Sequence, residues 1–165
     1  MAITYEPIAT TTLSSAAGTV SFTSISAAYT DIIAVINGAT VSGDYGLWYR
    51  INNDSGTNYS NTYLLGNGTS ASSSRDTSQT QGIAGNNIST TRGTTIVHFM
   101  NYSNTTTYKT QLGRTNDSSI NAGATVSLWR STAAINRIDF AVGASFPTGQ
   151  FASGSTFTLY GIASA

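Results

Sequence analysis

The side chains that could carry out chemistry in this chain are few and scattered. Seven carboxylates and one histidine occur in 165 residues. Titratable groups must converge to form a catalytic site, and no two of these carboxylates have a spacing that a strand or a helix would place side by side. Six of the seven fall in segments expected to be turns or strand edges, where Asp commonly stabilises turns. A pair assembled across the fold, as in glycosidases, stays open. The acids are Glu6, Asp31, Asp44, Asp54, Asp76, Asp117 and Asp139.

The other residue types that support catalysis or metal binding also lack the necessary patterns. His98 shares a strand phase with the apolar residues Ile96 and Met100, which predicts that its ring faces inward. A single His without partners builds neither a catalytic triad nor a metal site. Nucleophile-elbow, P-loop and dinucleotide motifs are absent. The loop at 52–58 gathers oxygen atoms but lacks the carboxylates and the final Glu of a calcium loop. The sequence therefore predicts no enzyme, no cofactor and no bound metal.

The composition points to a protein that works in an assembly. Only 8% of residues are charged, against about 25% in a typical soluble protein, and seven basic residues balance seven acidic ones. Nucleic acids and anionic lipids attract clustered cations, so we expect neither nucleic-acid binding nor membrane insertion. The chain has no cysteine, which excludes disulfides and thiolate chemistry. Proteins with a net charge near zero tend to associate.

The elements that must position any site are strands. Thr, Ser, Val, Ile, Tyr and Gly are plentiful, and the helical period is nearly absent. Strands connected without helices predict antiparallel pairing, so we expect an all-β antiparallel β-sandwich of jelly-roll type with eight or nine strands. Residues 1–18 are expected to form an extended N-terminal arm, residues 19–165 one sandwich domain, and residues 66–93 and 143–155 long loops. The expected strands lie at 19–25, 32–36, 45–51, 59–65, 94–100, 108–115, 125–131, 135–142 and 157–162.

Aromatic residues supply the candidate binding site. Trp48 alternates with the apolar phase of its strand, and Trp129 shares a phase with Thr125 and Ser127. Both tryptophans are therefore predicted on outer faces, where a Trp can bury against a neighbouring subunit or stack on a sugar ring. The alternative is that each packs inside the fold. Tyr45 is a further candidate for glycan stacking.

Six stretches spread over nearly the whole chain stand out by their sequence and order, at 5–10, 20–25, 29–33, 50–60, 68–74 and 154–162. Together they resemble a type of domain found in tail and fibre proteins of phages, especially marine and cyanobacterial ones. The resemblance implies a structural domain and brings no catalytic residues with it. The N-terminus lacks a basic segment followed by an apolar one, so we expect synthesis in the host cytoplasm without a signal peptide.

The function predicted from these observations is that of a non-enzymatic bacteriophage virion protein exposed on the particle surface. A tail, baseplate or fibre component is one location, and a capsid decoration or cement protein is the alternative. The expected partners are further copies of the chain, as a homotrimer, and other virion proteins. A carbohydrate-binding module for host-surface glycans, using Trp48, Trp129 and Tyr45, is a further alternative from another class of function.

Overall fold

The computed structural model describes residues 4–117 and 119–163. These residues form twelve strands and no helix, so the all-β prediction is confirmed. No described helix is therefore long and apolar enough to cross a membrane. The strands are β1 (Tyr5–Thr12), β2 (Thr19–Phe22), β3 (Asp31–Gly38), β4 (Tyr45–Ile51), β5 (Tyr59–Gly66), β6 (Ala71–Gln79), β7 (Gly82–Ile88), β8 (Gly93–Met100), β9 (Lys109–Asp117), β10 (Asn121–Trp129), β11 (Ile138–Gly143) and β12 (Thr156–Ile162).

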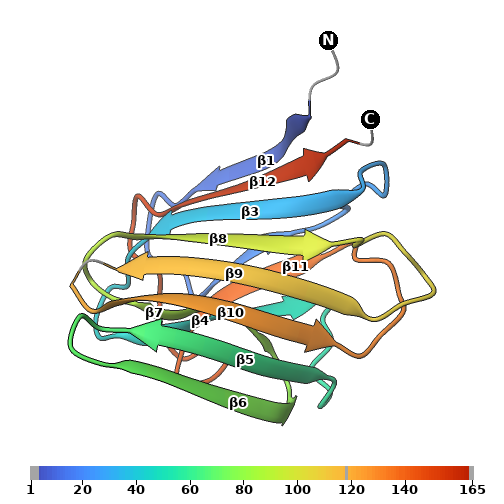
Figure 1. Ribbon diagram of the computed structural model, residues 1–165. Helices are drawn as coiled ribbons and strands as arrows, with labels where there is room; N and C mark the ends of the chain where they lie inside the picture. Colours follow the sequence, from blue (N-terminus) through green and yellow to red (C-terminus); the bar gives the residue numbers. More distant parts are fainter. Residues whose placement is uncertain (1–3, 118, 164–165) are drawn as a thin grey trace.

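The strands form two sheets that pack as a sandwich. The large sheet has eight strands in the order β1-β12-β3-β8-β9-β10-β5-β6, and the small sheet has four in the order β2-β11-β4-β7. In Figure 1 the large sheet lies in front of the small one. All paired strands are antiparallel, as connections without helices allow. The antiparallel β-sandwich is thus confirmed, and the jelly-roll type stays a prediction.

Three strands were missed by the sequence prediction. β6 and β7 occupy most of the expected loop at 66–93, and that expectation is therefore wrong. β6 has no apolar pattern because it is an exposed edge strand of Ser and Thr. β7 has the sequence GIAGNNI, and glycines are unfavourable inside strands, so the pattern does not predict one. The segment 1–18, expected to be an arm, instead contributes β1, which pairs with β12 at the opposite edge of the large sheet.

The apolar core lies between the two sheets. Leu47, Tyr49 and Ile51 alternate inward from β4, as their spacing predicts, and each is almost fully buried. Aromatic rings then join the layers edge to face: the ring centroids of Tyr49 and Phe99 are 5.1 Å apart. Such contacts add to area burial, and they hold β4 of the small sheet against β8 of the large one.

β7 is an edge strand of the small sheet, yet it is buried. Polar side chains of the large sheet satisfy its free edge. Asn61 on β5 accepts a hydrogen bond from the N–H of Ile83 at 3.1 Å, and Ser127 on β10 donates to the Ile83 carbonyl at 3.3 Å. Thr125 donates to the carbonyl of Ala84 at 3.3 Å. Buried backbone groups need such partners, so this part of the interior is polar by necessity.

Candidate functional site

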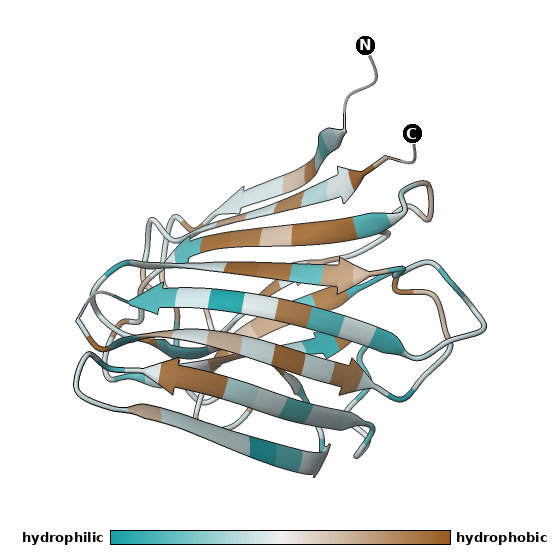
Figure 2. Ribbon diagram, in the orientation of Figure 1, coloured by the Kyte–Doolittle hydropathy of each residue, from teal (hydrophilic) through white to brown (hydrophobic). Residues whose placement is uncertain are grey.

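The outer face of the large sheet, which points away from the small sheet, has an apolar centre. Successive side chains of a strand point to opposite faces, and paired residues share a face. Ile33 and Val35 therefore point outward, since Ile32, Ala34 and Ile36 are buried in the core. A continuous apolar run such as that at 32–36 predicts a strand covered on both faces, and this is wrong: β12 and β8 flank β3, but no layer of the described residues lies over its outer side. Figure 2 shows brown segments on β3, β8, β10 and β5.

The strand register aligns the outward apolar side chains in rows across the sheet. One row runs through Tyr160, Ile33, His98, Leu112 and Val126 on five neighbouring strands. A second row runs through Val35, Ile96, Arg114, Ala124 and Leu64. We call the members of these two rows, together with Tyr5 and Leu128, the outer patch. Leu112 is 43%, Val126 46% and Leu64 60% exposed. Contiguous apolar patches on soluble proteins mark interaction sites.

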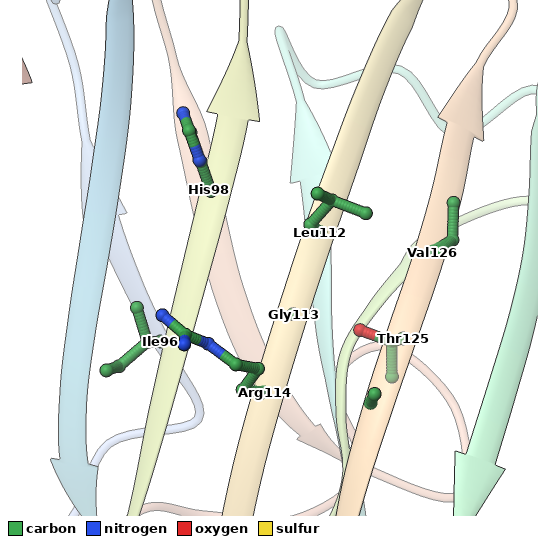
Figure 3. A pocket seen from close by; sticks show the side chains of 8 residues that line it. Ile96, His98, Leu112, Gly113, Arg114, Thr125 and Val126 are labelled. Atoms are coloured by element: carbon green, nitrogen blue, oxygen red, sulfur yellow. The ribbon is translucent and has the colours of Figure 1, made fainter.

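A shallow depression of about 340 Å³ lies in the middle of the outer patch. Ile96 and His98 border it on the β8 side, and Leu112 and Val126 on the β9 and β10 side (Figure 3). The side chain of Arg114 extends across toward Ile96. A second depression of about 330 Å³ continues from Ile96 and Arg114 toward Tyr5 and Tyr160. Apolar side chains dominate both linings, so these hollows suit the side chains of a partner better than a polar ligand.

His98, in the middle of the first row, faces Asp31 at the margin of the outer patch, and Arg114 lies apart from this pair. The Nε2 atom of His98 is 2.9 Å from Oδ2 of Asp31, and the other oxygen of Asp31 accepts the N–H of Asn101 at 2.6 Å. The expectation that His98 faces the interior is wrong: it shares its phase with Ile96 as predicted, but that phase is the outer one. Arg114 is exposed, and the ion pairs found among the described residues do not include it.

The aromatic residues singled out from the sequence do not form one site. Trp129 is only 3% exposed, and its Nε1–H donates to Oδ2 of Asp54 at 2.6 Å. Its predicted outward position is therefore wrong. Trp48 lies on the outer side of the small sheet, as its phase predicts, but it is half-buried and donates to the carbonyl of Gly143 at 2.7 Å. Tyr45 packs partly against the core. None of the three belongs to the outer patch.

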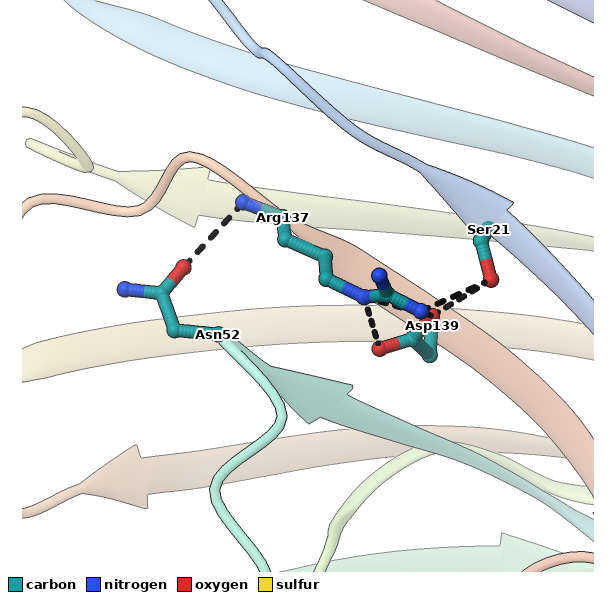
Figure 4. A network of polar contacts seen from close by, with 4 residues as sticks. All are labelled: Ser21, Asn52, Arg137 and Asp139. Atoms are coloured by element: carbon teal, nitrogen blue, oxygen red, sulfur yellow. Dashed lines mark hydrogen bonds and ion pairs between the residues drawn. The ribbon is translucent and has the colours of Figure 1, made fainter.

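The most connected charged cluster on the small sheet is structural. Arg137 donates from Nε to Oδ2 and from Nη2 to Oδ1 of Asp139, each at 2.8 Å. Asp139 is almost fully buried and also accepts a hydrogen bond from Ser21. The side chain of Asn52 accepts the N–H of Arg137 at 3.1 Å (Figure 4). These contacts join β2, β11 and the turn after β4, and they leave the carboxylate engaged rather than poised for proton transfer.

The loop at 52–58 uses its oxygen atoms internally. The carboxylate of Asp54 accepts hydrogen bonds from the N–H of Gly56 at 2.8 Å, from Nδ2 of Asn58 at 2.9 Å and from Trp129. No group of three His, Cys, Asp or Glu residues that suits a metal ion occurs in residues 4–117 and 119–163. Through these hydrogen bonds of Asp54, the loop connects β4, β5 and the end of β10.

Acid titration of Asp54 tests whether these hydrogen bonds to its carboxylate stabilise the fold. Burial acts to raise the pKa of its carboxyl, but the hydrogen bonds from Trp129, Asn58 and Gly56 outweigh burial and lower the pKa below its usual value. A carboxyl whose pKa is lower in the folded state stabilises the fold above the unfolded-state pKa, and this contribution is lost as the pH falls below about 4. We expect Asp54→Asn to cost about 2 kcal/mol at pH 7, from hydrogen bonds to a charged group.

The measurement is urea unfolding of wild type and Asp54→Asn between neutral and acidic pH. The free energies of unfolding should converge as the pH falls, because the amide of the variant does not titrate. Asp117, whose pKa is also lowered by hydrogen bonds from Ser119 and Ser89 against the raising effect of burial, remains in both proteins. Asp117 should therefore make the free energy of unfolding of wild type and of Asp54→Asn fall by a similar further amount in acid. Curves that stay parallel across the whole pH range would contradict the role of Asp54.

No protein-family model, no curated protein and no solved structure matches this chain. The resemblance to phage tail and fibre domains therefore stays a prediction, and the argument for function depends on the surface of the molecule itself. The outer patch was not anticipated from the sequence. Its signal was present in the alternation of β8, β9 and β10, where Ile96, Leu112 and Val126 each occupy the phase opposite to residues that the fold buries.

Proposed function

We propose that this chain is a non-enzymatic structural protein of a bacteriophage particle, exposed on the exterior as a component of the tail, baseplate or fibre. The observation that carries the proposal is the outer patch, a sheet face that a monomer would leave open to water. Burial of apolar area is the main driving force for protein association. A face of this kind on a Ser- and Thr-rich chain with a net charge of zero suits a subunit whose working state is an assembly.

The proposed partners are further copies of the chain, as a homotrimer, and other proteins of the particle. Long polar connections flank the sheets. Gly149 of the connection at 144–155 lies against Tyr45 of the small sheet. Such connections supply contacts to neighbouring components without a charged surface. The same resemblance that predicts a phage protein from the sequence supports this location.

Glycan binding is less well supported than structural assembly. Stacking on a sugar needs an exposed aromatic face together with convergent polar groups. Trp129 is buried, Tyr45 packs against the core, and Trp48 has its Nε1–H bound within the molecule. The aromatic residues that motivated the glycan hypothesis are thus largely engaged in holding the fold, and we retain the structural role alone.

Immunogold labelling of intact particles of the encoding phage tests the proposal. An antibody against the purified chain should place gold on the tail, baseplate or fibres, and preincubation of the antibody with the purified chain should remove the label. Gold spread evenly over the head would replace the tail location with that of a capsid decoration protein. Particles without label, but with the protein abundant in the lysate, would overturn the virion role.

A further inference from the structure

We propose that the outer patch of the large sheet is covered by another copy of the same chain. The inference rests on the proposed function, since a structural subunit works in an assembly, and it names the surface and the partner that this assembly uses. The centre of the contact is the depression between Ile96, Leu112 and Val126, with Tyr5 and Tyr160 at one side and Leu64 at the other.

The available area matches what a stable association between copies requires. Eight strands spaced about 4.8 Å apart and about eight residues long give a face of roughly 34 by 26 Å. That area of close to 900 Å² is the whole face with its polar margins, and the outer patch is its apolar centre. A standard specific interface, which likewise has an apolar core and a polar rim, buries about 800 Å² on each partner. The composition also fits, because Ile, Leu, Val and Tyr side chains on a sheet are what the inner layer of a sandwich presents to a second sheet about 10 Å away.

The edges of the large sheet are less suited to association than its face. β1 carries Pro7, which has no N–H to donate, and its pairing with β12 has a bulge between Pro7 and Ala9. Both features protect an edge against added strands. At the other edge, β6 is an exposed polar strand that carries Arg75 and Asp76, and inward or edge charges disfavour strand addition in the same way. Association is thus directed to the apolar face.

The charges of the outer patch favour a second copy over a different partner. Arg114 is exposed within the apolar rows and is part of neither ion pair of the described chain. Asp31 lies at the margin of the same face with its side chain 23% exposed, and a carboxylate offers about four acceptor sites, of which His98 and the N–H of Asn101 use two. Each copy therefore brings one cation outside those ion pairs and one acidic acceptor, so it offers a charge of each sign to a neighbouring copy.

Sedimentation equilibrium of matched variants tests the inference. Wild type is expected to sediment as a multiple of the 17.2 kDa chain at concentrations of about 1–100 µM. Val126→Glu and Leu112→Glu should shift the mass to that of one chain, because each places a charge in the centre of the contact. Val41→Glu is the control: Val41 is 51% exposed, close to Val126, but lies in the connection after β3 and outside the sheet.

Three results would overturn the inference. They are a wild type that stays at the mass of one chain throughout the range, face variants that remain associated, and a control that dissociates together with them. A monomeric wild type would leave the outer patch to a different protein of the particle.

A milder substitution keeps the inference testable where a buried charge harms the fold. The chain has no cysteine, so Val126→Cys and Val41→Cys each introduce a single thiol. We expect the thiol at 126 to react with a maleimide at least tenfold more slowly than the thiol at 41 in concentrated protein, and the difference to shrink on dilution. Equal rates at all concentrations would contradict coverage by another copy.

The outcome is separable from that of the proposed function. Labelled particles with a monomeric purified chain would retain the structural role and reject self-association through the outer patch. An associating chain without particle label would reject the virion role and retain the contact.

Discussion

Trp129→Ala is expected to lower the free energy of unfolding by about 3–5 kcal/mol, the range observed when a large buried aromatic side chain is removed. Trp129 is 3% exposed and packs in the core cluster. Its Nε1–H also donates to Asp54 at 2.6 Å, so alanine leaves both a cavity and a carboxylate with one partner fewer. Urea unfolding followed by far-UV circular dichroism measures the loss.

Trp48→Ala is the matched control for this prediction. Trp48 is half-buried on the outer side of the small sheet and makes one hydrogen bond, to Gly143. We expect a cost of roughly 1–2 kcal/mol, because less apolar area returns to water. A loss at Trp48 equal to that at Trp129 would mean that the two indoles are buried alike, which would contradict the arrangement of the two sheets. Trp129→Phe, which keeps a ring but loses the donor, should fall between the two alanine variants.

Gly113→Ala is expected to cost about 3 kcal/mol or more, at the upper end of overpacking effects. Gly113 lies in β9 beneath β7, and a Cβ atom there would stand 2.2 Å from Oγ1 of Thr125 and 2.4 Å from the carbonyl oxygen of Ala84. The second contact is with backbone, so a rotamer change cannot relieve it. β7 would have to move away from the large sheet, and its hydrogen bonds to Thr125 and Ser127 would lengthen.

Gly66→Ala provides the comparison, because Gly66 also lies in a strand of the large sheet and has open space where its Cβ would be. We expect a change within about 1 kcal/mol of zero there, with a stabilising sign favoured by the lower entropy of the unfolded chain. The free energy of unfolding and the soluble yield of both variants are the measurements. Similar values for Gly113→Ala and Gly66→Ala would show that β7 does not approach β9 as closely as the structure has it.

The fold class could be predicted from the sequence because strand period is a local property. Local patterns, which are alternation in strands such as β4 and β11 and a continuous apolar run in β3, placed nine of the twelve described strands close to their observed bounds. Two of the three missed strands, β6 and β7, lack that alternation for physical reasons. β6 is an exposed edge with no face to bury, and β7 is held by its backbone, so neither strand needs large apolar side chains.

The candidate site could not be predicted, because it depends on which phase of each strand faces the other sheet. Local spacing correctly grouped Trp129 with Thr125 and Ser127, and His98 with Ile96. Local spacing could not tell that the group of Thr125, Ser127 and Trp129 faces inward and that the group of Ile96 and His98 faces outward. Ordinary sandwich strands bury their apolar phase, and the prediction of an exposed Trp129 followed from that rule.

The sequence by itself determined that this chain is a helix-poor protein of antiparallel strands with few charges and a net charge of zero, and which residues of each strand share a side. Only the tertiary structure decided which side of β5, β9 and β10 is inside. β7 lies buried over β9, β10 and β5, and its free backbone edge needs hydrogen-bond donors and acceptors. Asn61, Thr125 and Ser127 therefore turn inward to satisfy it. The apolar phase of the same strands, with Leu112 and Val126, is left facing outward, and this is the surface on which the proposed assembly depends.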